Sequence, residues 1–376
     1  KVLNSADASI DWEATTKHFN AGKVLVHLDD TTVNGSLGVR SFEAPAITFK
    51  LAVDSINADR YMPPPPPEGE EAAAKDKDAA DADAAELPVE ALRMLNLDGT
   101  ITVTEMTAIN LKYRDAKLHV KAKNGVVRLN PFGAKMYDGS YAGDITLNVQ
   151  KKQPRLSVNE RITGVQAGPL LLDLTGNDRL QGKADVTAKF TGTGITPDAL
   201  KKSVSGTAAF SFTDGAVKGV NIAGLIRNAQ AKLKGQEAPP DDQPNQTDFA
   251  LMKGTAKVTN GLVNNDDLLL QSPFLRISGK GQTHLAEETI DYTLTTKLVG
   301  SLEGQGGKSL EELKGVAIPV RIGGTYSKPT YTPDLGAALS EAAKAKVEEK
   351  VEKEKEKLKE KIEEKVGEKL LKGLFK

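Results

Sequence analysis

A regular alternation of apolar and polar residues dominates the sequence from residue 182 to residue 333. Within 184–191 each apolar residue is followed by Asp, Thr or Lys, and the pattern recurs at 207–213 and 290–295. Successive side chains of a strand point to opposite faces, so this alternation predicts antiparallel strands with one apolar and one polar face. What covers the apolar face therefore determines what the protein can do.

Strand patterns greatly outnumber helix patterns in the rest of the chain. We expect roughly a dozen strands between residues 87 and 333, but only three short helices, at 87–97, 167–174 and 221–233. Three short helices cannot cover so large a sheet. The sheet must therefore close on itself as a sandwich or barrel, or remain an open, curved groove. The apolar positions carry many Ala and Val and few aromatic residues, which favours the open groove.

Two segments of unusual composition divide the chain. Pro63–Pro67 and the acidic, Ala-rich residues after them have too few large apolar side chains to fold, which predicts a solvated loop. It either links two domains or is an insertion in one sheet. Near the C-terminus, Lys and Glu dominate and apolar residues recur every eleven positions, which predicts a long, nearly straight helix. The expected parts are a β segment (1–62), a loop (63–86), a β-groove domain (87–335) and a charged helix (336–376).

Composition argues against several classes of function. The 50 Lys and Arg residues balance 51 Asp and Glu residues, so there is no basic footprint for nucleic acid. The absence of Cys excludes disulfides, Cys-based zinc sites and a thiol nucleophile. The four His residues are far apart in the sequence, and no catalytic or phosphate-binding motif is present. We therefore expect a protein that is not an enzyme and that has no cofactor and no metal site.

The segment LQGKADVTAKFTGTG at 180–194 ends in G-x-G, and LKKSVSGTAAFSFTDGAVKGVNI at 200–222 contains S-x-x-G and a D-G turn. In order, these segments fit a strand that ends in G-x-G, a short helix, S-x-x-G, a second strand, and a D-G turn leading into a helix. This order resembles the C-terminal region of the AsmA family of Gram-negative envelope proteins. Further matches lie at 97–101, 134–143 and 320–334. The matching glycines are expected at turns, where positive φ is required.

The resemblance spans about residues 90–335 and implies function as well as fold. It implies a periplasmic protein held in the inner membrane by a helix upstream of this sequence. It also implies a long, twisted β-groove that conducts phospholipid between the inner and outer membranes and supports outer-membrane homeostasis. The family provides no catalytic residues. The alternative is a non-enzymatic assembly factor for outer-membrane protein or lipopolysaccharide biogenesis, with an envelope protein bound to the C-terminal helix.

The expected ligand is a phospholipid or another molecule with acyl chains, which would lie along the apolar face with its headgroup in water. The residues predicted to line this groove are Ile145, Leu147, Val149, Val186, Phe190, Phe210, Phe212, Ile290, Tyr292 and Leu294.

Overall fold

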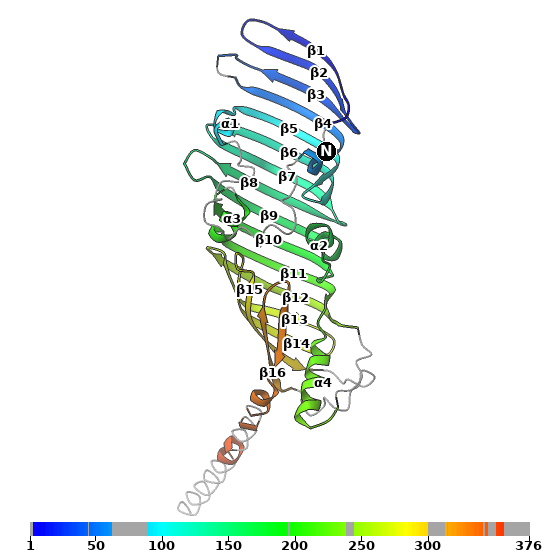
Figure 1. The fold of residues 1–376 in the computed structure, drawn as a ribbon, viewed down its shortest axis with the longest axis vertical. Coiled ribbons are helices and arrows are strands. Elements are labelled where there is room, and N and C mark those ends of the chain that lie inside the picture. The colour runs from blue at the N-terminus through cyan, green and yellow to red at the C-terminus, as the bar shows by residue number, and fades with distance from the viewer. Residues whose placement is uncertain are drawn as a thin grey trace, which may run out of the picture.

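A single long, twisted β-sheet of 17 strands forms most of the protein (Figure 1). The computed structural model describes residues 3–43, 45–61, 89–194, 196–237, 244–299, 313, 315–340, 343–344 and 351–356. Each strand pairs with the next one along the chain. At the two edges, β1 (Ala6–Ala14) pairs with β2 and β17 (Pro329–Pro333) pairs with β16, so the described sheet is open. The predicted mainly β, open architecture is confirmed, and neither a sandwich nor a closed barrel forms.

The strands follow one another down the long axis of the molecule. The N-terminal strands after β1 are β2 (Phe19–Leu28), β3 (Thr31–Val39) and β4 (Ile47–Asn57). The central strands are β5 (Leu97–Ala108), β6 (Leu111–Lys123), β7 (Val126–Met136), β8 (Gly139–Asn148), β9 (Arg155–Gln166), β10 (Lys183–Thr193) and β11 (Ser205–Lys218). The C-terminal strands before β17 are β12 (Gln246–Thr259), β13 (Leu262–Gln271), β14 (Leu275–His284), β15 (Thr289–Leu298) and β16 (Ala317–Gly324).

One pair of neighbouring strands departs from the expected antiparallel order. Strands β4 and β5 are parallel, with Ile47 opposite Leu97 and Val53 opposite Val103. Parallel neighbours need a long crossover connection, and the chain between them includes η1 (Ala58–Tyr61) and α1 (Val89–Met94). The predicted loop at 63–86 lies outside the described residues. Strands on either side of it nevertheless hydrogen-bond within one sheet.

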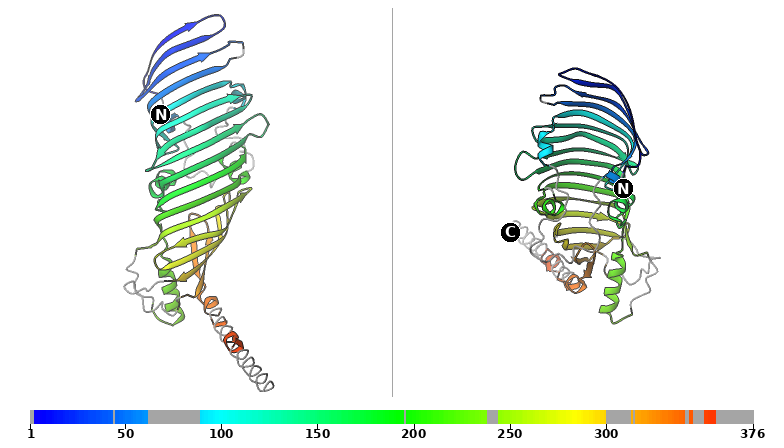
Figure 2. Two further views of the ribbon diagram at one scale, coloured as in Figure 1. Left: turned by 180° about the vertical axis from the view of Figure 1, so that it is seen from behind. Right: turned by 45° about the horizontal axis from the view of Figure 1, so that its top comes forward.

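The short helices lie at the ends of the strands rather than across the sheet. Helices α1 and α3 (Pro197–Ser203) flank one end, and α2 (Ala167–Thr175) and α4 (Ile222–Leu233) flank the other (Figure 1). From behind, the strands lie in front of the helices (Figure 2). Helix α3 is the short helix that the family pattern places between G-x-G and S-x-x-G. Thr196 caps its first turn by accepting a hydrogen bond from the Ala199 amide, and Pro197 follows at the start. None of the helices in the described residues is long and apolar enough to cross a membrane.

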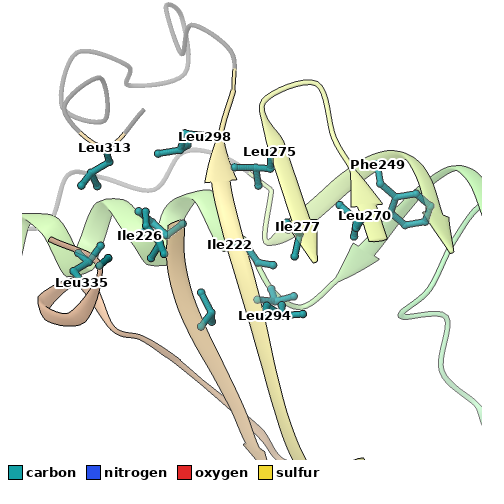
Figure 3. Close-up of a cluster of buried hydrophobic side chains, with 14 residues drawn as sticks. Ile222, Ile226, Phe249, Leu270, Leu275, Ile277, Leu294, Leu298, Leu313 and Leu335 are labelled. Carbon is teal, nitrogen blue, oxygen red and sulfur yellow. The ribbon is translucent and has the colours of Figure 1, made fainter. Parts of the chain in front are cut away.

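A hydrophobic core covers the C-terminal end of the sheet (Figure 3). Ile222 and Ile226 of α4 pack against strand residues that include Ile277 and Leu294, and Leu335 joins the same cluster. The Asn221 side chain accepts a hydrogen bond from the Gly224 amide and so fixes the start of α4. Helix α4 therefore covers the apolar side of the sheet at this end, where the side chains form a buried hydrophobic core.

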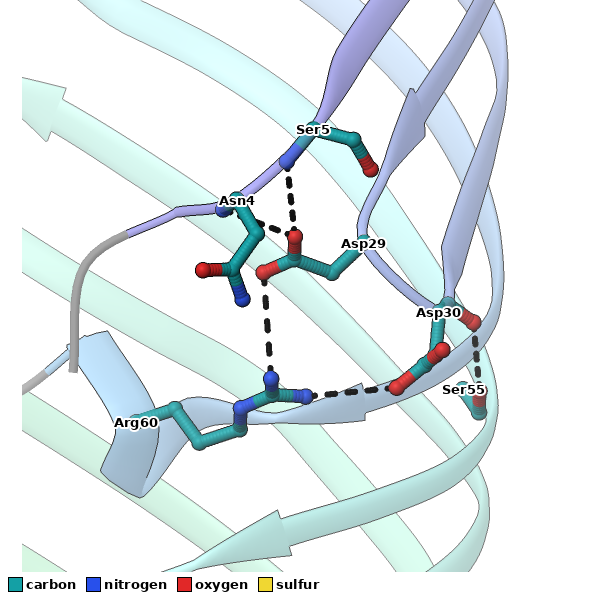
Figure 4. Close-up of polar contacts among 6 residues, drawn as sticks. All are labelled: Asn4, Ser5, Asp29, Asp30, Ser55 and Arg60. Atoms are coloured by element: carbon teal, nitrogen blue, oxygen red, sulfur yellow. Dashed lines mark hydrogen bonds and ion pairs between the residues drawn. The ribbon is translucent and has the colours of Figure 1, made fainter.

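A polar cluster holds the N-terminal edge in place (Figure 4). The carboxylate of Asp29, in the turn between β2 and β3, accepts hydrogen bonds from the amides of Asn4 and Ser5 at 2.9 Å. These bonds hold the pKa of Asp29 below its usual value. Arg60 of η1 approaches Asp29 at 3.8 Å and Asp30 at 3.4 Å. The start of β1 is thus anchored by side chains from two later segments.

The long C-terminal helix predicted for 336–376 is not supported as one continuous element. Residues 335–340, 343–344 and 351–356 are helical. The other residues of the predicted helix lie outside the described part of the chain. Asp334 caps the first of these helical turns by accepting a hydrogen bond from the Ala337 amide at 3.0 Å.

Candidate functional site

The strand register gathers apolar side chains from all parts of the sheet onto one face, here called the apolar face. Opposite residues in a ladder share a face, so each pair extends the assignment to the next strand. Phe190 pairs with Val158, which pairs with Ile145 on the next strand. The same reasoning reaches Trp12 on β1 at one edge and Tyr331 on β17 at the other. Intervening residues such as Thr187 and Lys189 point to the opposite, polar face.

The side chains on the apolar face are shortest along one row of directly paired residues on β8–β12, here called the central row. Its members are Gly143, Glu160, Ala188, Ala208 and Ala256. Four of these five residues have no side chain beyond Cβ. The row runs across the strands and therefore along the long axis of the molecule (Figure 1).

Larger side chains stand on both sides of the central row. One flanking row contains Tyr141, Ile162, Val186 and Phe210 and ends at Gly254. The other contains Ile145, Val158, Phe190 and Val258, with Gly206 between Phe190 and Val258. Apart from the buried Val258, these flanking side chains are half-buried. Small residues between two rows of large apolar ones make a surface that suits a linear apolar chain.

The structure places nine of the ten predicted lining residues at strand positions on the apolar face, and Val149 follows the last residue of β8. Those that remain half-buried are Ile145, Leu147, Val186, Phe190, Phe210, Phe212, Ile290 and Tyr292. Val149 is fully buried, and its carbonyl accepts a hydrogen bond from Arg93 of α1 at 2.7 Å. Leu294 is 7% exposed and belongs to the core beneath α4. Val149 and Leu294 are therefore structural, and the eight accessible residues lie on β8, β10, β11 and β15.

The prediction missed several residues of this surface. Tyr141, Val158 and Ile162 follow the same alternation, and the register joins them to the predicted residues. Tyr141 also packs edge-on against Phe132, with ring centroids 4.9 Å apart, and Tyr113 completes an aromatic group. Aromatic pairs of this geometry stabilise the packing beyond their buried area. The alternation in 139–162 could have found these residues.

Glu160 is the charged side chain that the register of the described strands places in the central row. Its Oε2 atom lies over Gly143, is shielded from solvent and has no hydrogen-bond partner of good geometry among the described residues. Burial raises the pKa of Glu160, and only the nearby Tyr141 hydroxyl opposes the shift by hydrogen bonding. Burial also raises the pKa of Tyr141, and the neighbouring Glu160 carboxylate raises it further.

A second polar pair lies on the apolar face nearer the C-terminal core. The Tyr292 hydroxyl donates a hydrogen bond to Asn265 Oδ1 across β13–β15. Burial raises the pKa of Tyr292 to about 12, and the neighbouring Asp267 adds to the shift. Tyr292 therefore remains a neutral hydrogen-bond donor over the physiological range, and its polar end is already satisfied.

The polar face has a different character. A depression of about 840 Å³ crosses β8–β12 on this side, and its lining includes Arg161, Lys189, Lys257 and Asp144. Its polar lining does not suit an acyl chain. In the described part of the chain, no three His, Asp or Glu side chains come together as a metal site would require.

The fold and the site together define a class of protein: an open, elongated β-sheet with one accessible apolar face. The sequence profile of the AsmA family matches residues 2–268, and the chain belongs to this family. Protein AsmA of Escherichia coli (strain K12) is 23% identical over 331 residues. That alignment covers 85% of this chain and 53% of the relative, so the chain spans about half the length of the curated relative. No solved structure matches the chain significantly.

Proposed function

We propose that the apolar face is a lipid-binding groove in which acyl chains lie along the central row. The observation that carries this proposal is a continuous line of small residues between two rows of half-buried large ones, such as Val186 and Phe190. Helix α4 covers only the C-terminal end of this face. A surface of this kind gains about 0.8 kcal/mol for each methylene that it removes from water.

The wider role follows from the family. We propose that the protein acts in the periplasm, is anchored in the inner membrane by a segment upstream of this sequence, and contributes to phospholipid transport between the two membranes and to outer-membrane homeostasis. In this role it has no catalytic function. The chain supplies a path along the sheet for the acyl chains, and the phosphate of the lipid headgroup remains in water beside it.

The test is to purify the protein without detergent, extract it with organic solvent and identify bound lipid by mass spectrometry. The Val186→Asp variant places a charge on the apolar face, and its matched control, Thr187→Asp, places one on the polar face. We expect V186D to lose most of the bound lipid and T187D to retain it. Equal lipid content in the two variants, or no lipid in the unchanged protein, would contradict the proposal.

A second candidate function is a scaffold that pairs with a partner strand at the β1 edge. Every residue of β1 is exposed, and Trp12 is 65% exposed although it stacks on Phe19 at a centroid distance of 6.1 Å. An exposed edge strand offers unpaired backbone groups to a partner. A photo-crosslinker at position 10 distinguishes the two functions. Specific protein adducts together with a lipid-free sheet would favour the scaffold.

A further inference from the structure

Glu160 has a place on the apolar face that the packing around it does not account for. It lies in the central row between Gly143 and Ala188, where every other member is Gly or Ala. The side chain is half-buried, its Oε2 is shielded from solvent without a well-directed partner, and the Tyr141 hydroxyl is the neighbouring group that reaches the carboxylate. A shielded carboxylate oxygen without a partner reduces stability unless a ligand supplies the missing contact.

The cations near Glu160 in sequence cannot supply that contact. Arg161 is adjacent in β9 and Lys189 lies on β10, and the alternation directs both side chains to the polar face. The register of the described strands places no Lys or Arg on the apolar face at all. The described strands therefore offer Glu160 no positive charge on its own face.

We propose that Glu160 and Tyr141 form a recognition point for the protonated amino group of an acyl-chain amphiphile bound in the central row. The carboxylate accepts charge-assisted hydrogen bonds from the ammonium group, which are stronger than bonds between neutral partners. The Tyr141 hydroxyl, which lies beside Glu160, holds the carboxylate in place. The aromatic ring of Tyr113, which packs on Tyr141 at 6.3 Å between centroids, adds a π face nearby that also attracts a cation.

The chemistry excludes an anionic group at this point. A phosphate or carboxylate beside Glu160 would bring two negative charges together in a region of low dielectric constant, which is strongly unfavourable. The ligand's phosphate, where it has one, must point away from the central row. This inference rests on the proposed function, because it assigns a preferred headgroup to the same groove.

The test compares two lipids with identical chains, dioctanoyl phosphatidylethanolamine and dioctanoyl phosphatidylglycerol, by isothermal titration to the full chain below their micelle concentrations. We expect the unchanged protein to prefer the ethanolamine lipid by about tenfold in Kd, the factor that equals 1.4 kcal/mol. The near-isosteric Glu160→Gln variant should reduce that preference to less than about twofold while it still binds both lipids. Glu105→Gln, which changes an exposed carboxylate on the polar face, is the matched control and should retain the preference.

The outcomes separate this inference from the proposed function. If E160Q binds both lipids with an unchanged preference, the recognition point is wrong and the groove stands. If neither lipid binds the unchanged protein, the groove and the recognition point both fail. Tyr141→Phe gives a further test, because loss of the hydroxyl should weaken the preference less than E160Q does.

Discussion

The ring of Phe210 on β11 lies over Gly254, the residue directly opposite it on β12. A Cβ atom at position 254 would come within 2.9 Å of Phe210 Cζ, closer than side-chain contacts allow. The absence of a side chain at 254 therefore lets the ring fold down onto the sheet. This contact sets the height of one wall of the proposed groove.

Gly254→Ala should lift the Phe210 ring and destabilise the protein by about 1–3 kcal/mol, the usual range for overpacking. The free energy of unfolding from urea denaturation measures the effect. Gly133→Ala is the matched control, because the nearest atom to a Cβ there is the Tyr141 carbonyl oxygen at 3.9 Å. Equal stability of the two variants would show that Phe210 moves aside without cost.

The sequence is sufficient to predict the sheet because alternation is a local signal. Val186, Phe190 and Phe210 were assigned to one face from period two alone, and the register places them there. The parallel pairing of β4 with β5 was not predictable, because it depends on a crossover rather than on local pattern. The predicted loop at 63–86 could be read either as a linker or as an insertion, and only the pairing across it shows one sheet.

The site was harder to predict because burial is a tertiary property. Leu294 and Ile290 have the same alternation, yet α4 covers the first and leaves the second half-buried. Glu160 was missed for a related reason. Its sequence context, Asn159-Glu160-Arg161, is typical of an exposed strand face, and only the register shows that Glu160 shares a face with Val186 and Tyr141.

Ile226→Ala should destabilise the C-terminal end by about 2–5 kcal/mol, because Ile226 is fully buried between α4 and the sheet. Leu233→Ala is the control on the same helix. Leu233 is 59% exposed, so we expect a change within about 0.5 kcal/mol. Thermal unfolding followed by circular dichroism measures both variants. A small effect for I226A would mean that α4 does not stabilise this end of the sheet.

Asp29→Gly should loosen β1 without unfolding the rest of the sheet. The variant removes the acceptor for the Asn4 and Ser5 amides, and glycine tolerates the positive φ of 52° at this position. Hydrogen exchange should become faster in β1 and remain unchanged in β6. Asp30→Gly, which removes a more exposed carboxylate, is the control. Unchanged exchange in D29G would show that pairing with β2 alone holds the edge.

Glu160→Gln should stabilise the protein at neutral pH and leave its stability unchanged in acid. Burial raises the pKa of Glu160 in the folded state, so the folded state holds this proton more tightly than the unfolded state does. Stability from this group is therefore greatest below the unfolded pKa of about 4.3 and declines as the pH rises through the folded pKa.

Glutamine does not ionise and avoids that loss. The difference in unfolding free energy, E160Q minus unchanged protein, should grow from near zero at acid pH to a positive value at neutral pH. Urea denaturation across this range measures it, with Glu105→Gln as the exposed control. A difference that is constant with pH would show that Glu160 is solvated like a surface carboxylate, and it would weaken the case for a ligand that supplies its missing charge.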